Sequence, residues 1–137
     1  MACPHFYPTA RLDTNTWAVA PRLPLGDAYA GECRAQGTSF QPDEATTREI
    51  CNVGYGHECC ERFPLDAEAD AIRFHVMSDA GELIRIQYTF EKDCWPRQHG
   101  VFEFPLTRQE LSDGPADQIL RRQATTFLES YRRRKAK

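Results

Sequence analysis

The sequence predicts an α+β fold in which a small antiparallel sheet is covered by a C-terminal helix. Apolar and polar residues alternate over 72–76 and again over 84–90, which is typical of strands with one buried and one wet face. Near the C-terminus, apolar residues return every three or four positions, the period of an amphipathic helix. Residues 1–64 show little periodicity and hold five of the six cysteines, which predicts an irregular, cysteine-bearing half.

The sheet is expected to begin with a hairpin over 71–91. Residues 78–82, Ser-Asp-Ala-Gly-Glu, supply the turn between its two strands. A third strand is expected near 101–104, where two phenylalanines flank Glu103. The Trp95-Pro96 and His99-Gly100 pairs are typical of loops and predict the connection before this strand.

The main helix is expected to open at Gly114-Pro115, because proline is favoured at the first helical position. Four apolar residues mark its buried face: Leu120, Ala124, Phe127 and Tyr131. A shorter helix is expected at 42–51, with Asp43 and Glu44 in its first turn. The capping-box pattern at 107–110 predicts one further helical turn.

A length of 137 residues is that of one ordinary domain. We therefore expect a single domain over 1–137, in which 1–64 is the irregular half and 65–137 holds the sheet and helix. No run approaches 18 apolar residues, so membrane insertion is not expected. The first residues do not resemble a secretory signal, and this favours a cytoplasmic protein.

Charge is distributed unevenly along the chain. Residues 121–137 hold seven basic residues and one acidic residue, although the whole chain has a net charge of −3. Cations at the end of a helix complement its dipole and need no partner. The alternative is that the basic C-terminal helix docks on an acidic protein partner. The acidic remainder of the chain would repel phosphates and makes nucleic acid an unfavoured ligand.

The six cysteines allow three kinds of chemistry. Disulfides are possible for an even number, but a cytosolic protein keeps its thiols reduced. Structural zinc sites use short Cys-x₂₋₄-Cys pairs, and this sequence has none. An iron–sulfur cluster offers four separate iron corners, so four distant segments can each supply one thiolate. The sequence therefore favours a [4Fe–4S] cluster, with zinc as the alternative cofactor.

The expected ligands are four cysteines that lie near a glycine, a proline or a predicted helix end: Cys3, Cys33, Cys51 and Cys60. The same residues are the expected cofactor-binding set. Three residues close by in the sequence are substitute candidates: Cys59, His5 and His57. Cys94 lies at the end of the second predicted strand, and we expect it to be a partly buried structural residue.

These cysteines stand in four short motifs. They are Cys-Pro-x-Phe-x-Pro at 3–8, Arg-Leu-Pro-Leu-Gly-Asp at 22–27 followed by Cys33, Cys-Asn-x-Gly-Tyr at 51–55 and Cys-x-Arg-Phe-Pro at 60–64. Together the motifs resemble small bacterial proteins of uncharacterised function that carry such cysteine motifs. The resemblance covers mainly the first half of the chain. It implies that the four cysteines act as one set and implies no activity.

The chain lacks the common catalytic motifs, including the Walker loop, Gly-x-Ser-x-Gly and His-Glu-x-x-His. The sequence therefore favours a non-enzymatic role. The leading hypothesis is an iron–sulfur protein that transfers electrons, senses redox state or stabilises its own fold. Two other hypotheses remain: a zinc-stabilised interaction subunit that docks through its basic helix, and a thiol redox protein.

Overall fold

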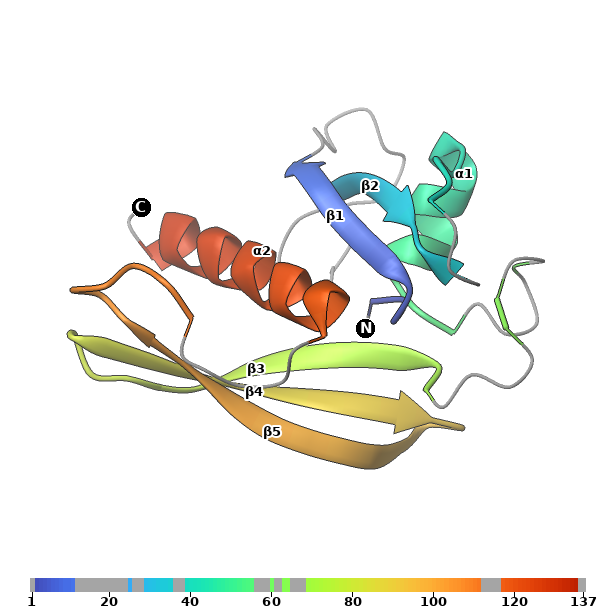
Figure 1. Cartoon of the computed structure of the whole chain (residues 1–137). Coiled ribbons are helices and arrows are strands. Elements are labelled where there is room, and N and C mark those ends of the chain that lie inside the picture. Colours follow the sequence, from blue (N-terminus) through green and yellow to red (C-terminus); the bar gives the residue numbers. More distant parts are fainter. Residues whose placement is uncertain are drawn as a thin grey trace.

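The protein has the predicted α+β fold, formed by a three-stranded antiparallel sheet, a two-stranded antiparallel sheet and a long C-terminal helix (Figure 1). The structure is a computed structural model. It describes residues 2–11, 25, 29–35, 39–55, 60, 63–64, 69–111 and 117–135. The predicted arrangement of a sheet covered by the C-terminal helix is confirmed.

The larger sheet contains strands β3 (Ala71–Asp79), β4 (Leu83–Lys92) and β5 (Trp95–Pro105) in the order β3-β4-β5. The predicted hairpin is β3 and β4. Along β4, Ile84 and Ile86 are buried whereas Arg85 is exposed. The apolar positions of the alternating pattern are therefore those on the buried face of the sheet.

Strand β5 is longer than the sequence predicts, and the expected connection at Trp95-Pro96 and His99-Gly100 is wrong. The turn instead lies at Asp93 and Cys94, whose φ angles are 52° and 66°. Two consecutive positive φ angles are typical of a two-residue hairpin turn. Proline is tolerated in β5 because this is an edge strand. A Cβ at Gly100 would overlap the ring and hydroxyl of Tyr88 on β4, so a larger residue there would displace the Tyr88 side chain.

Helix α2 (Gln118–Lys135) covers the inner face of this sheet. Leu120, Ala124 and Leu128 are buried in one cluster with apolar residues of β4 and β5. Phe127 is only half-buried and stacks on Phe74 of β3, with 5.5 Å between ring centroids. The predicted start of this helix at Gly114-Pro115 lies outside the described residues.

The N-terminal half is not purely irregular, which corrects the expectation for residues 1–64. Strands β1 (Phe6–Arg11) and β2 (Tyr29–Cys33) pair as a second antiparallel sheet. Their sequences lack a clear apolar–polar alternation, so periodicity could not reveal them. Gly31 allows this pairing, because a Cβ there would collide with the backbone of Tyr7 and Pro8.

The helix predicted at 42–51 is present in that segment. Asp43 caps helix α1 (Glu44–Thr46) by accepting a 2.7 Å hydrogen bond from the Thr46 N–H. The chain then continues through one wide turn, η2 (Thr47–Cys51), in the π-helical conformation. The predicted turn of helix at 107–110 is a tight turn instead, in which Gln109 has a φ of 54°.

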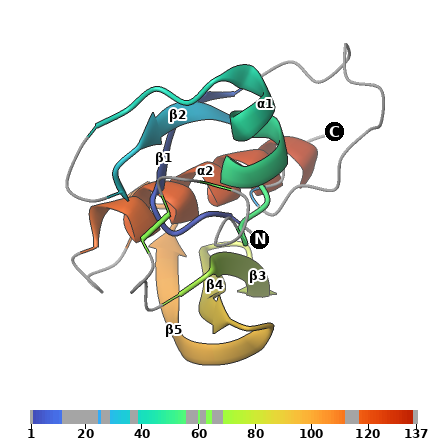
Figure 2. The ribbon, with the colours of Figure 1, turned by 90° about the vertical axis from the view of Figure 1, so that its right-hand side faces the viewer.

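The two sheets lie on opposite sides of α2, as the two views show (Figures 1 and 2). Ala2 joins them by exchanging two 2.7 Å backbone hydrogen bonds with Ile72 of β3. Phe74 and Phe127 contact both apolar clusters. None of the described helices is long and apolar enough to span a membrane. The result is a layered structure that brings the N-terminal turn against α2.

Candidate metal centre

Four thiols line one small cavity in the N-terminal half, and they are the four that the sequence favours as ligands. Cys3 precedes β1, Cys33 ends β2, Cys51 ends η2, and Cys60 follows in the sequence. The other lining residues are His5, Phe6, Ala35, Ile50 and Phe63. Cys3, Cys33 and Cys51 are buried and Cys60 is half-buried. Residues up to 57 positions apart in sequence thus line the same cavity.

Backbone hydrogen bonds fix the segments that carry these cysteines. The Cys3 N–H donates to the Cys51 carbonyl at 3.0 Å. Cys33 pairs with Phe6 across the small sheet and exchanges hydrogen bonds of 2.7 and 2.9 Å with Phe40. The Cys60 carbonyl accepts from the Phe63 N–H at 3.1 Å. The position of each thiol therefore follows from local backbone structure.

Asn52 does not line the cavity, but it positions Cys51, a role that the sequence analysis did not predict. Its side chain is buried and accepts from the Tyr29 N–H at 3.0 Å. Its amide also donates to the carbonyls of Tyr29 and Thr47 at 3.0 and 2.8 Å. These bonds fasten η2 to β2, and so they set Cys51 relative to Cys33. An asparagine directly after Cys51, one of the expected ligands, is the signal that could have revealed this role.

Helix α2 reaches the site through Gln123, which the sequence analysis also missed. Its side chain is fully buried, and Nε2 donates to the carbonyls of Cys3 and Phe6, both at 2.8 Å. Gln123 lies beside Leu120 and Ala124 on the buried face of the helix. A polar residue within an apolar helix face was therefore the available signal.

Burial makes two thiols of this cavity, Cys3 and Cys51, weak acids in the absence of a cation. Burial raises the pKa of Cys3 to about 12, and negative charge on Cys33 or Cys60 acts in the same direction. Burial likewise raises the pKa of Cys51 to about 12, with further contributions from Cys3, Cys33 and Cys60. These mutual effects reflect the closeness of the four sulfurs.

Two backbone N–H groups favour the ionised form of one of these thiols. The N–H groups of His5 and Phe6 donate toward the sulfur of Cys3 and partly oppose the effect of burial on its pKa. Such N–H···S bonds stabilise negative charge on sulfur and tune metal–thiolate centres. The turn from Cys3 to Phe6 thus offsets part of the cost that burial imposes on a thiolate at Cys3.

The free space between the thiols is about 10 Å³, room for roughly one water molecule. Among the described residues, no three His, Cys, Asp or Glu side chains are arranged to hold a single metal ion. One zinc ion would require the sulfurs to draw closer around one point, since each Zn–S bond is about 2.3 Å. A cluster would require the side chains to turn outward, since each thiolate binds its own iron.

The remaining candidate residues lie elsewhere or are not described. Cys94 is exposed in the β4–β5 turn and not partly buried as expected. Cys59 and His57 lie outside the described residues, whereas His5 lines the cavity. The five described cysteines are all free thiols.

Several arginines of the basic helix contact the rest of this chain. Arg122 donates to the carbonyls of Pro8 and Thr9 at 2.7 and 3.2 Å. Arg132 donates to Gln109 at 2.8 Å and lies over the Phe104 ring. These contacts give two of the seven basic residues a structural role.

The chain was compared with protein-family models, curated proteins and solved structures. No family model matches it, and neither a curated protein nor a solved structure shows significant similarity.

Proposed function

We propose that this is a cytoplasmic iron–sulfur protein in which Cys3, Cys33, Cys51 and Cys60 hold one [4Fe–4S] cluster. The observation that carries the proposal is that these four thiols line the same cavity. They come from four separate segments, and each segment is fixed by its own backbone hydrogen bonds.

The donor set fits this group. The cavity offers four thiols and no carboxylate among its described lining residues, and thiolate is the usual ligand of iron in such clusters. The buried thiols of Cys3 and Cys51 resist ionisation on their own, because burial raises their pKa. Iron would supply the positive charge that stabilises the thiolates.

A cluster is favoured over a single zinc ion by the way the cysteines reach the cavity. Each arrives from a different segment, which suits a ligand with four separated corners. The N–H groups directed at Cys3 add the kind of hydrogen bond that adjusts the potential of a cluster.

A cluster with a thiolate at every corner has no open position for a substrate. It would transfer single electrons, respond to redox conditions or stabilise the N-terminal half. This chain's own part is to bury the sulfurs, to direct N–H groups at one of them and to exclude water with Phe6, Ile50 and Phe63.

The test is to purify the full chain without oxygen and to measure its iron, sulfide, zinc and visible absorption. The proposal predicts a brown protein with about four irons and four sulfides per chain. A colourless protein with about one zinc per chain would replace the cluster by a structural zinc site. Protein without either metal would exclude both.

A further inference from the structure

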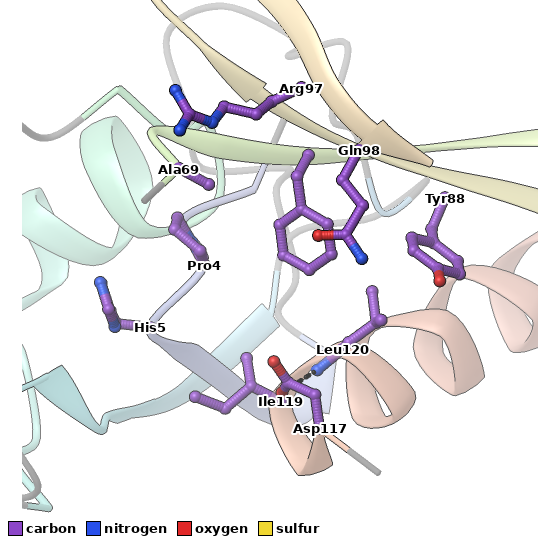
Figure 3. A pocket seen from close by; sticks show the side chains of 10 residues that line it. Pro4, His5, Ala69, Tyr88, Arg97, Gln98, Asp117, Ile119 and Leu120 are labelled. Carbon is purple, nitrogen blue, oxygen red and sulfur yellow. Dashed lines mark hydrogen bonds between the residues drawn. The ribbon is translucent and has the colours of Figure 1, made fainter. Parts of the chain in front are cut away.

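His5 stands between the cysteine cavity and a second, more open pocket. It lines the cysteine cavity together with the four thiols. It also lines a pocket between the sheet and the start of α2, where Tyr88, Gln98 and Asp117 contribute polar groups. Figure 3 shows His5 and Pro4 on one side of that pocket, and Tyr88 on the other. The imidazole is therefore part of the wall that separates the two spaces.

Backbone hydrogen bonds and a ring contact fix the position of His5, but its Nε2 atom has no hydrogen-bond partner. The His5 carbonyl accepts from the Arg34 N–H at 2.8 Å, and its own N–H is directed at the Cys3 sulfur. The ring packs edge-on against Phe63, with centroids 5.3 Å apart and planes at 76°. Its Nε2 atom is buried and has no hydrogen-bond partner.

An unpartnered buried nitrogen destabilises the fold, because it has lost its hydrogen bonds to water and gained none in their place. In the described part of the chain, only one other buried side-chain atom shares this property, the Oε1 of Gln123. Gln123 lies on α2, and its side chain binds the carbonyls of Cys3 and Phe6, so both residues with an unpartnered atom meet at the Cys3–Phe6 turn. Two buried polar atoms without a partner at the same turn indicate that a further polar group binds there.

The lining of the cysteine cavity restricts what this group can be. Apart from the thiols, the described lining side chains other than His5 are hydrocarbons. His5 thus provides the one imidazole nitrogen beside a set of sulfurs. An imidazole has at least one N–H group in either protonation state, so His5 can donate a hydrogen bond.

We propose that His5 donates a hydrogen bond from Nε2 to a sulfur of the metal centre in the cysteine cavity. This inference rests on the proposed function and assigns His5 as a tuning residue that is not itself a ligand. A donor to sulfur stabilises the more negative, reduced state of a cluster. His5 therefore raises the reduction potential of the centre.

The experiment is a redox titration of the anaerobically purified full chain, compared with His5→Phe and His5→Gln. Phenylalanine preserves the ring that packs on Phe63 but removes the donor, whereas glutamine can place an amide N–H in a similar position. The matched control is His99→Phe, which alters an exposed histidine of β5 away from the cavity.

We expect His5→Phe to keep its iron and sulfide and to show a more negative potential than the wild type. His5→Gln should recover part of the difference, and His99→Phe should match the wild type. Loss of iron from His5→Phe would contradict the inference, because it would make His5 a ligand or a structural residue. An unchanged potential, or equal shifts for Phe and Gln, would also overturn it. Wild-type protein without a cluster would instead refute the proposed function.

Discussion

At the scale of single residues, the acidity of the buried thiols determines how the site responds to pH. Burial raises the pKa of Cys3 and Cys51 to about 12 in the absence of a cation. At neutral pH both thiols therefore carry protons in the absence of a cation. Metal ligation requires thiolates, so binding must release these protons.

From the proposed function, we predict that a metal bound by the four thiols is retained more strongly as pH rises. Below a pKa of about 12, each proton released strengthens apparent binding about tenfold per pH unit, so two such thiols give roughly a hundredfold. The measurement is the fraction of metal retained against a fixed excess of chelator at pH 7 and pH 8. A change smaller than tenfold would show that Cys3 and Cys51 are not both protonated before binding.

Metal retention can also distinguish residues that position the cysteines from the proposed ligands themselves. Asn52 makes three hydrogen bonds, to the backbone of Tyr29 and Thr47, and contributes no sulfur. Removing a buried hydrogen-bonding side chain costs about 1–3 kcal/mol when its partners stay buried. Its effect on the metal is therefore expected to be indirect, through the placement of Cys51.

We predict that Asn52→Ala lowers the free energy of unfolding by about 1–3 kcal/mol and weakens metal retention without abolishing it. Denaturant unfolding and metal analysis of the same sample provide the two values. Val53→Ala is the neighbouring control, because Val53 is 42% exposed. Complete loss of metal from Asn52→Ala at unchanged stability would contradict a purely positioning role.

At the scale of elements, α2 has two tasks, which residues on two different faces of the helix perform. Leu120 and Leu128 are buried against the three-stranded sheet. Between them, Gln123 binds the turn that carries Cys3. The helix thus contacts both the three-stranded sheet and the turn that lines the cysteine cavity.

We predict that Leu120→Ala lowers the free energy of unfolding by about 2–5 kcal/mol, because the side chain is 1% exposed. Glu129→Ala, on the exposed face of the same helix, should change it by less than about 0.5 kcal/mol. Equal effects of the two substitutions in denaturant unfolding would mean that α2 does not pack on the sheet through this face.

We predict that Gln123→Leu costs about 1–3 kcal/mol of stability, since two buried carbonyls lose their donor. Hydrogen exchange should become faster in the turn from Cys3 to Phe6, whereas β4 should stay protected. Gln118→Leu, in the exposed first turn of α2, is the control. Unchanged exchange in the turn would show that Gln123 does not hold it.

The sequence predicted the elements whose periodicity is set by burial on one face. The β3–β4 hairpin and α2 belong to this class, because each alternates or repeats against one apolar layer. Strand β5 was placed too late in the chain because Pro96 and Gly100 resemble loop residues. Pro96 is tolerated because β5 is an edge strand, and Gly100 leaves room for the side chain of Tyr88 on β4.

The candidate site was accessible to sequence analysis only in part. Cysteines are rare enough to be singled out one by one, and their local motifs favoured Cys3, Cys33, Cys51 and Cys60. Gln123 reaches the Cys3 carbonyl across 120 positions of sequence, and no local pattern encodes such a contact. Strands β1 and β2 stayed hidden because each is short and held by its partner and by a glycine that allows close approach.

At the scale of the whole molecule, the cysteine cavity lies where the N-terminal half meets α2. Ala2 continues the edge of β3, and Gln123 holds the next turn. The sheet and helix share an apolar cluster of their own. The N-terminal half has a smaller cluster that includes Cys3 and Cys51. A metal bound by four thiolates would add the free energy that such a loop-rich half needs to become ordered.

The central claim is that four thiols act as one metal-binding unit, and the most direct measurement is iron content per chain in single cysteine variants. Cys3→Ser, Cys33→Ser, Cys51→Ser and Cys60→Ser should each lose most of the iron. Cys94→Ser, which changes an exposed thiol outside the cavity, should keep the wild-type content. Wild-type iron in Cys33→Ser together with its loss from Cys94→Ser would contradict the assignment.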